Sequence, residues 1–134
     1  MWERRRRSPL KRIDSLIGAG TVVHGDVTFK GGLRIDGHVH GNVVAAEGEP
    51  GTLVVSAQAR VEGEIRVSHV VINGTVNGPI SVGDHLELQP KARIVGDVSY
   101  RSIEMHVGAV IEGRLIHSEP GRASVVELKR QSAG

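Results

Sequence analysis

The sequence predicts an all-β protein whose chain forms a parallel β-solenoid of about six windings, each with three short strands. Three observations lead to this prediction: apolar and polar residues alternate with period 2, a short unit centred on Gly recurs, and 18 of the 134 residues are Gly. Alternation of this kind is typical of strands with one buried face. Aromatic residues make up only 2% of the chain. The core must therefore be built from aliphatic side chains.

The recurring unit reads apolar, any, Gly, any, apolar, and it occurs along the chain in long and compact versions. The two compact copies carry two glycines each, "IDGHVHGNV" at 35–43 and "INGTVNGPI" at 72–80. The stretch from Ser15 to Leu115 holds six copies, close to 17 residues per winding. Residues 46–51 ("AEGEPG") interrupt the repeat and are expected to form an extruded loop, because added loop length costs little. The long copies run from Ser15 to Gly25, Leu53 to Gly63, Leu86 to Gly96 and Ile103 to Gly113.

The Gly of each copy occupies the inward phase of the alternation, where a packed core normally uses a larger side chain. We interpret these glycines as corners, at which a side chain would crowd the axis and only Gly permits the backbone angles. The inward aliphatic residues are expected to stack, with one column made of Val23, Ile35, Val61, Ile72, Ile94 and Ile111. The predicted corner glycines are Gly25, Gly37, Gly41, Gly63, Gly74, Gly78, Gly96 and Gly113.

Charge and composition divide the chain into three segments. We expect a disordered basic arm over residues 1–14, the solenoid over 15–116 and a disordered polar tail over 117–134. Residues 1–12 carry six basic side chains against one acidic side chain, a net charge of +5. Residues 13–115 carry eight against twelve, a net charge of −4. This asymmetry indicates a surface-binding arm on a mildly acidic body.

The compartment follows from what the sequence lacks. Cys is absent, which excludes disulfides and thiolate metal sites. No apolar run approaches the roughly 18 residues that cross a bilayer, and the N-terminus lacks the apolar core of a signal peptide. We therefore expect a cytoplasmic protein, peripheral on the inner face of the cell membrane.

The arm "MWERRRRSPLKR" predicts the membrane contact. Trp favours the membrane interface, and each basic side chain near anionic lipid contributes about 1 kcal/mol. Two alternatives stay open: a solvated tail without a partner, or a segment that binds a protein or another polyanion, with nucleic acid the least expected. The predicted membrane-binding residues are Trp2, Arg4, Arg5, Arg6, Arg7, Lys11 and Arg12.

Residues 13–116 resemble the bactofilin family. The resemblance depends on "IDSLIGAGTVVHGDVTFKGGLRIDGHVHGNV" (13–43), followed by the units "VEGEI", "IVGDV" and "IEGRL". It implies a right-handed β-helix that polymerises without nucleotide through its terminal windings. It also implies a cytoskeletal scaffold, often attached to the cytoplasmic membrane by an N-terminal peptide, that serves enzymes of cell-wall synthesis, stalks or polar organisation.

A solenoid leaves a complete unpaired winding at each end, and such edges pair with another chain unless they are covered. Each contact of this kind adds a rung of main-chain hydrogen bonds, so no energy source is needed. The segment "SVVEL" (124–128) is an alternative to open ends, because it can form one covering strand. The predicted polymerisation residues are Leu16, Ile17, Val22, Ile103, Met105, Ile111, Leu115 and Ile116.

No catalytic residue, metal ligand or cofactor is predicted. His38 and His40 share one face of a strand at a spacing that suits a metal, but no third ligand has a fixed place beside them. His24 and His106 also fall on the outward phase. Neither a nucleophile turn of the G-x-S-x-G type nor a phosphate-binding loop is present. We expect the protein to bind neither nucleotide nor metal.

Two other functions remain as alternatives. The first is a hexapeptide-like β-helical acyltransferase with a catalytic His24 or His69, although its hallmark of an aliphatic residue at every sixth position is missing. The second is a non-polymerising adaptor or polysaccharide-binding solenoid, although the sequence offers few aromatic side chains for sugar stacking. Client proteins of a scaffold are expected on outward strands such as those with Arg34 and Asp36 or with Glu62, Glu64 and Arg66.

Overall fold

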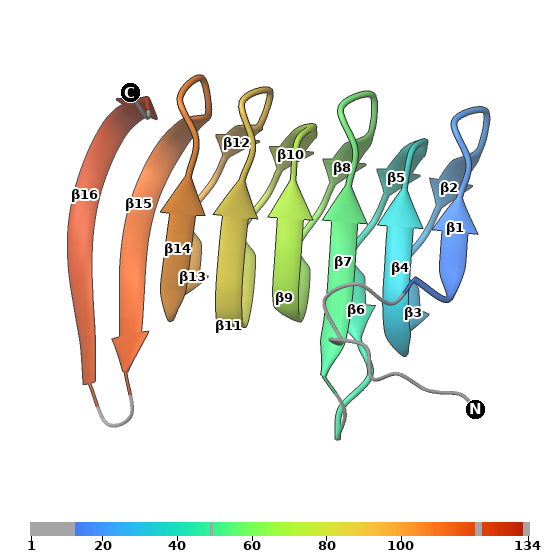
Figure 1. Ribbon diagram of the computed structural model, residues 1–134, viewed down its shortest axis with the longest axis horizontal. Coiled ribbons are helices and arrows are strands. Elements are labelled where there is room, and N and C mark those ends of the chain that lie inside the picture. The colour runs from blue at the N-terminus through green and yellow to red at the C-terminus, as the bar shows by residue number, and fades with distance from the viewer. Residues whose placement is uncertain (1–12, 49, 120–121, 133–134) are drawn as a thin grey trace, which may run out of the picture.

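The computed structural model describes residues 13–48, 50–119 and 122–132, with side chains described as far as Ser118. These residues form strands and no helix, and nearly all strand pairs are parallel. The described part therefore contains no helix that could cross a membrane. The predicted β-solenoid is confirmed. In Figure 1 the chain passes up the near face, over the top and down the far side while it advances to the left, which is the sense of a right-handed helix.

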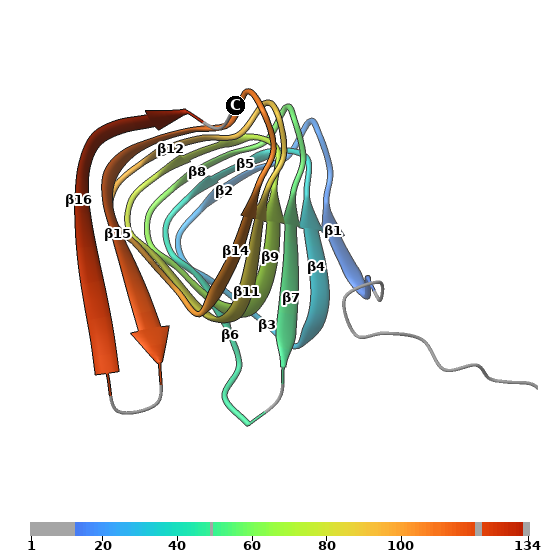
Figure 2. The same ribbon diagram turned by 60° about the vertical axis from the view of Figure 1, so that its left-hand side comes forward.

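Each of the six windings contributes one strand segment to each of three faces, as the view in Figure 2 shows. The first face holds β1 (Ser15–Ile17), β4 (Gly31–Ile35), β7 (Gly51–Val55), the later parts of β9 (Ile65–Ile72) and β11 (Ile80–Leu88), and β14 (Ser102–Met105). The second holds β2 (Val22–His24), β5 (His38–His40), β8 (Arg60–Glu62), β10 (Thr75–Asn77), β12 (Arg93–Val95) and the start of β15 (Val110–Glu119). The third holds β3 (Val27–Phe29), β6 (Val43–Ala45), the starts of β9 and β11, β13 (Val98–Tyr100) and the later part of β15.

The core consists of aliphatic columns that run along the solenoid. The predicted column was wrong in two members, because Ile35 and Ile72 belong to the first face. In the compact windings the strand of the first face ends at these residues, and the next inward residues, Val39 and Val76, take the places on the second face. The column of the second face is Val23, Val39, Val61, Val76, Ile94 and Ile111. The column that contains Ile35 and Ile72 is Ile17, Ile35, Val55, Ile72, Leu88 and Met105.

Six of the eight predicted corner glycines form one column at the turn from the second face to the third. Their φ angles lie between +129° and +158°, a conformation that L side chains rarely adopt. A Cβ atom at Gly63 would overlap the carbonyl oxygen of Gly41 in the preceding winding. From the second winding on, the side chain is therefore excluded by the preceding winding along the stack, and not by crowding at the axis, whereas a Cβ atom at Gly25 in the first winding would meet no atom within 4 Å. The members of this column are Gly25, Gly41, Gly63, Gly78, Gly96 and Gly113.

The other two predicted corner glycines, Gly37 and Gly74, lie at the turn from the first face to the second in the compact windings. Both are buried. A Cβ atom at Gly74 would overlap the carbonyl oxygen of Ser56, which belongs to the wider turn of the winding before. These two positions require Gly because the narrow turn of a compact winding lies against the wider turn of the preceding winding, which leaves no room for a side chain.

A polar ladder follows the glycine column. The backbone N–H of Asn42 donates to Asp26 Oδ1 (2.9 Å), and the N–H of Glu64 donates to Asn42 Oδ1 (2.9 Å). The next position of the ladder is Pro79, which has no N–H to donate. Short polar side chains at this corner therefore satisfy backbone donors of the following winding.

Two segments depart from the regular winding. The predicted loop is confirmed between β6 and β7, although Gly51 already belongs to β7. The C-terminal segment differs from the expected disordered tail, because β15 continues to Glu119 and β16 (Arg122–Ser132) pairs with it in antiparallel orientation. Figure 1 shows β16 at the end of the solenoid opposite to β1. An edge strand with a free row of N–H and C=O groups tends to acquire a partner, and β16 supplies one within the same chain.

Candidate functional site

The first winding leaves three strand edges available at the N-terminal end of the solenoid. Strands β1, β2 and β3 pair with β4, β5 and β6 respectively, each on one side. Within residues 13–48, 50–119 and 122–132, no strand pairs with their other edges. Three edges in one plane offer a complete rung of main-chain donors and acceptors to a further chain.

Apolar side chains accompany these edges. Leu16 on β1 is 61% exposed and Val22 on β2 is 51% exposed, although both are large aliphatic residues. Ile17, the third residue predicted at this end, is half-buried and packs against the core. Exposed aliphatic residues beside open strand edges are typical of a surface that pairs with another protein.

The C-terminal end differs because β16 covers most of it. Ile103 and Met105 lie on β14, which pairs only with β11 among the strands described. The other three residues predicted at this end lie on β15, opposite β16. Ile111 lies opposite Gln131 and is fully buried, Leu115 lies opposite Val126, and Ile116 lies opposite Val125. Among the described strands of this end, only β14 has an open edge, so the two ends of the solenoid are not equivalent.

The predicted membrane-binding residues Trp2, Arg4, Arg5, Arg6, Arg7, Lys11 and Arg12 lie outside the described residues. Several charged side chains of the described body form ion pairs. Arg34 Nε lies 3.0 Å from Asp36 Oδ1, and Arg66 Nη2 lies 3.0 Å from Glu64 Oε2. The outward strands expected to bind client proteins therefore present paired charges of both signs.

The ion pair between Arg114 and Asp97 lowers a pKa. Arg114 Nη2 donates to Asp97 Oδ2 (2.9 Å), and the Arg114 backbone N–H donates to Asp97 Oδ1 (3.1 Å). The side-chain hydrogen bond, followed by the backbone hydrogen bond, holds the pKa of Asp97 below its ordinary value of 3.8. The bonds join the fifth and sixth windings at the corner that carries the polar ladder.

The histidines named as alternative sites occupy separate places. The rings of His24 and His40 stack at 5.1 Å, and His40 Nδ1 lies 3.1 Å from Glu62 Oε1. His69 Nε2 lies 3.6 Å from Asp84 Oδ2. His38 lies on β5 opposite residues of β2 and β8, and no group of three possible metal ligands forms around it in the described part.

Sequence reasoning missed a different group of possible metal ligands, Glu87, Glu104 and His106, which the fold brings together from two windings. Glu87 and Glu104 are 17 residues apart but lie side by side in the register of β11 and β14. The sequence does contain a signal for this pair: residues separated by one winding length, close to 17 residues, are expected to lie side by side on neighbouring windings.

The fold and its ends define a class of protein: a parallel β-solenoid whose terminal strand edges are available for pairing. The chain belongs to the bactofilin family, because the model of that family, described as polymer-forming cytoskeletal, matches residues 15–116. It is similar to bactofilin BacO of Myxococcus xanthus strain DK1622, with 30% identity over 115 residues that span 82% of this chain and 88% of the relative. No solved structure matches the chain. The predicted family is thereby confirmed.

Proposed function

We propose that this protein is a non-enzymatic cytoskeletal scaffold that assembles end to end into filaments without nucleotide. The family is polymer-forming and cytoskeletal. The observation that carries the proposal is the first winding, which has three open strand edges and the exposed side chains of Leu16 and Val22. A second solenoid that stacks there continues the rungs of main-chain hydrogen bonds and covers the edges beside these aliphatic residues.

The difference between the two ends sets the order of assembly. Among the strands that the structure describes, the first winding has open edges on all three faces, whereas β16 leaves only β14 open at the other end. Contacts that include the first winding therefore form first. Growth through the last winding uses the edge of β14 or requires β16 to leave β15.

A matched pair of variants tests the contact at the first winding. Val22 and Val95 are 51% and 50% exposed and both point outward, but Val22 lies beside the open edge of the first winding, in register with His38, whereas Val95 lies in the fifth winding. We expect Val22→Asp to abolish filaments, because it places a charge beside the edge that pairs with the next subunit, and Val95→Asp to leave them intact. Sedimentation and negative-stain microscopy of nucleotide-free protein measure the outcome. Equal loss of filaments in both variants, with both folded by circular dichroism, would contradict the proposal.

The basic arm is proposed to hold the filament on the cytoplasmic face of the membrane. The support is its charge of +5 over residues 1–12 beside Trp2, together with the multiplication of weak contacts along a polymer. Co-sedimentation with vesicles that contain anionic lipid tests this step. Trp2→Ala and neutralisation of Arg4–Arg7 should release the protein, and vesicles of neutral lipid should not bind it. Unchanged binding of the neutralised arm would contradict this part.

Client proteins of cell-wall synthesis or polar organisation are proposed to bind the lateral faces. The support is that stacking at the ends leaves charged strands such as those of Glu62, Glu64 and Arg66 accessible.

An assay of acetyl-CoA turnover with amine and sugar acceptors tests the absence of catalysis. Turnover that disappears with His24→Ala or His69→Ala would favour an acyltransferase instead.

A further inference from the structure

The first face of the last two windings carries two carboxylates next to each other. Glu87 on β11 and Glu104 on β14 are register partners in a parallel pair, and both side chains point outward. Like charges directly opposite each other on neighbouring strands destabilise a sheet. A cation at this position removes that repulsion.

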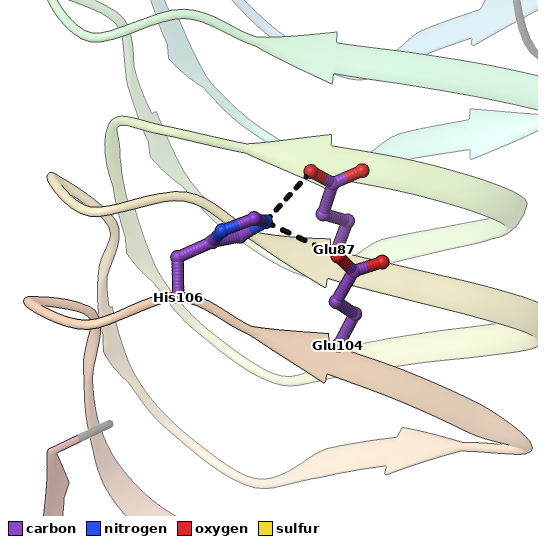
Figure 3. A group of neighbouring side chains, drawn as sticks. All are labelled: Glu87, Glu104 and His106. Carbon is purple, nitrogen blue, oxygen red and sulfur yellow. Dashed lines mark hydrogen bonds and ion pairs between the residues drawn. The ribbon is translucent and has the colours of Figure 1, made fainter. Parts of the chain in front are cut away.

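His106 completes the group from the turn that follows β14. Its Nε2 atom lies 3.0 Å from Glu87 Oε2 and 3.4 Å from Glu104 Oε2. Dashed lines mark these two contacts in Figure 3. Among the residues that the structure describes, these three form the one group of ligand atoms that all lie within 4.8 Å of one another. The side chains are 26% to 55% exposed, so an ion can reach them from solvent.

The spacing of these atoms fits a small divalent ion. Zn²⁺ binds His nitrogen and carboxylate oxygen at about 2.0 to 2.2 Å, so cis or tetrahedral ligands of one ion lie about 3.0 to 3.5 Å apart. The two distances from His106 Nε2 already fall in this range. Only side-chain rotation is needed to bring the carboxylate oxygens around one point.

The backbone holds all three residues in place. Glu87 and Glu104 belong to paired strands. The His106 backbone N–H donates to the carbonyl of Leu88 (2.9 Å), and the His106 carbonyl accepts from the N–H of Ala109 (3.1 Å). Ligands fixed by secondary structure lose little freedom on binding a metal, which favours affinity.

We propose that Glu87, Glu104 and His106 form a Zn²⁺ site that links the fifth and sixth windings. Zn²⁺ carries two positive charges, which match the charges of the two carboxylates. Imidazole with carboxylates suits Zn²⁺, while Mg²⁺ and Ca²⁺ prefer oxygen ligands alone. Three protein ligands leave a fourth position for water or for a group from another molecule. Bound Zn²⁺ joins β14, the strand with the open edge at the C-terminal end, to β11.

Calorimetric titration of the tag-free full-length protein with ZnCl₂ tests the site. We expect one Zn²⁺ per chain, and at least tenfold weaker binding in Glu104→Gln and in His106→Ala. The matched control is His40→Ala with Glu62→Gln, which removes another exposed His–Glu contact (3.1 Å) on the second face. This control should bind Zn²⁺ as the wild type does.

Thermal unfolding supplies a second measurement that does not depend on binding heat. Zn²⁺ should raise the Tm of the wild type and of the control variant by the same amount, and it should leave the Tm of Glu87→Gln/Glu104→Gln unchanged. Equal Zn²⁺ affinity in the wild type and in this double variant would overturn the proposal, as would the absence of binding to the wild type. Filament formation by the apo protein stays a separate question, so the two proposals can fail independently.

Discussion

The glycine column is explained at the scale of single residues by two constraints that coincide. Gly63 has a φ angle of +157°, and the carbonyl oxygen of Gly41 fills the space that a Cβ atom on Gly63 would need. Any other residue would meet both backbone strain and the adjacent winding.

Gly63→Ala therefore tests the account of the column. Strain and overpacking each cost about 1 to 3 kcal/mol, so we expect the free energy of unfolding to fall by about 2 to 6 kcal/mol. Gly20→Ala is the control, because no atom lies within 4 Å of the position of its added Cβ and its φ is not positive. Its effect should stay within about 0.5 kcal/mol. Equal stability of the two variants in urea denaturation would refute the explanation.

Asp97 predicts a pH dependence. Its pKa is lowered in the folded state by Arg114, so its contribution to stability is present above the ordinary value of 3.8 and is lost as the pH falls through the folded value. Asp97→Asn keeps an oxygen acceptor but removes the charge. We expect its Tm to lie below that of the wild type at pH 6, and the gap to close below pH 3.8.

Asp26→Asn is the matched control for this titration. Asp26 accepts the equivalent backbone N–H, from Asn42, and the described residues form no ion pair with it. Its gap from the wild type should be smaller at pH 6. A gap for Asp97→Asn that persists unchanged at pH 3 would show that the ion pair does not stabilise the folded state.

For single residues, the sequence predicted where the corner glycines lie better than it predicted why Gly is required there. All eight predicted corner glycines lie at turns between faces, but at seven of them (all except Gly25) the obstruction comes from the neighbouring winding, which a single repeat does not reveal. The group of Glu87, Glu104 and His106 was missed because it depends on register between windings. The short spacing that drew attention to His38 and His40 identifies only possible metal ligands on the same strand, not ligands on neighbouring windings.

At the scale of elements, β16 decides how the C-terminal end behaves. Its antiparallel pairing runs from Glu119 opposite Arg122 to Val110 opposite Ser132, so it occupies the outer edge of β15 on two faces. This arrangement predicts that β16 restrains assembly at that end.

A chain that ends at Glu119 tests this restraint. Without β16 the edge of β15 is free, and we expect a larger sedimented fraction and a shorter lag before filaments appear. Val22→Asp in the shortened chain shows which end responds, because pairing through the last winding should survive this change. Reduced assembly of the shortened chain would indicate that β16 supports the contact and does not block it.

The elements show where sequence patterns suffice. The six windings and the extruded loop follow from the recurring Gly unit, because each copy has the same geometric role. The strand over 122–132 was foreseen only as an alternative over 124–128, since few aliphatic residues mark it. Ile35 and Ile72 were assigned to the wrong column because each compact winding contains two Gly units. The order of these units along the chain does not show which face of the solenoid each unit belongs to.

At the scale of the whole molecule, the solenoid is a rod whose lateral surface carries charged side chains and whose two ends differ from each other. Windings about 4.8 Å apart give six of them a length of roughly 29 Å. The lateral surface carries ion pairs such as Arg66–Glu64 and Arg114–Asp97, whereas the first winding carries open edges and apolar side chains. This distribution favours growth along the axis over lateral association.

Cryo-electron microscopy of filaments grown from the tag-free full-length protein without nucleotide tests this central claim most directly. We expect filaments one solenoid wide, with strands perpendicular to the filament axis and a spacing of about 4.8 Å that continues across the junction between subunits. Protein that stays monomeric at tens of micromolar, or filaments in which solenoids associate side by side, would contradict the account.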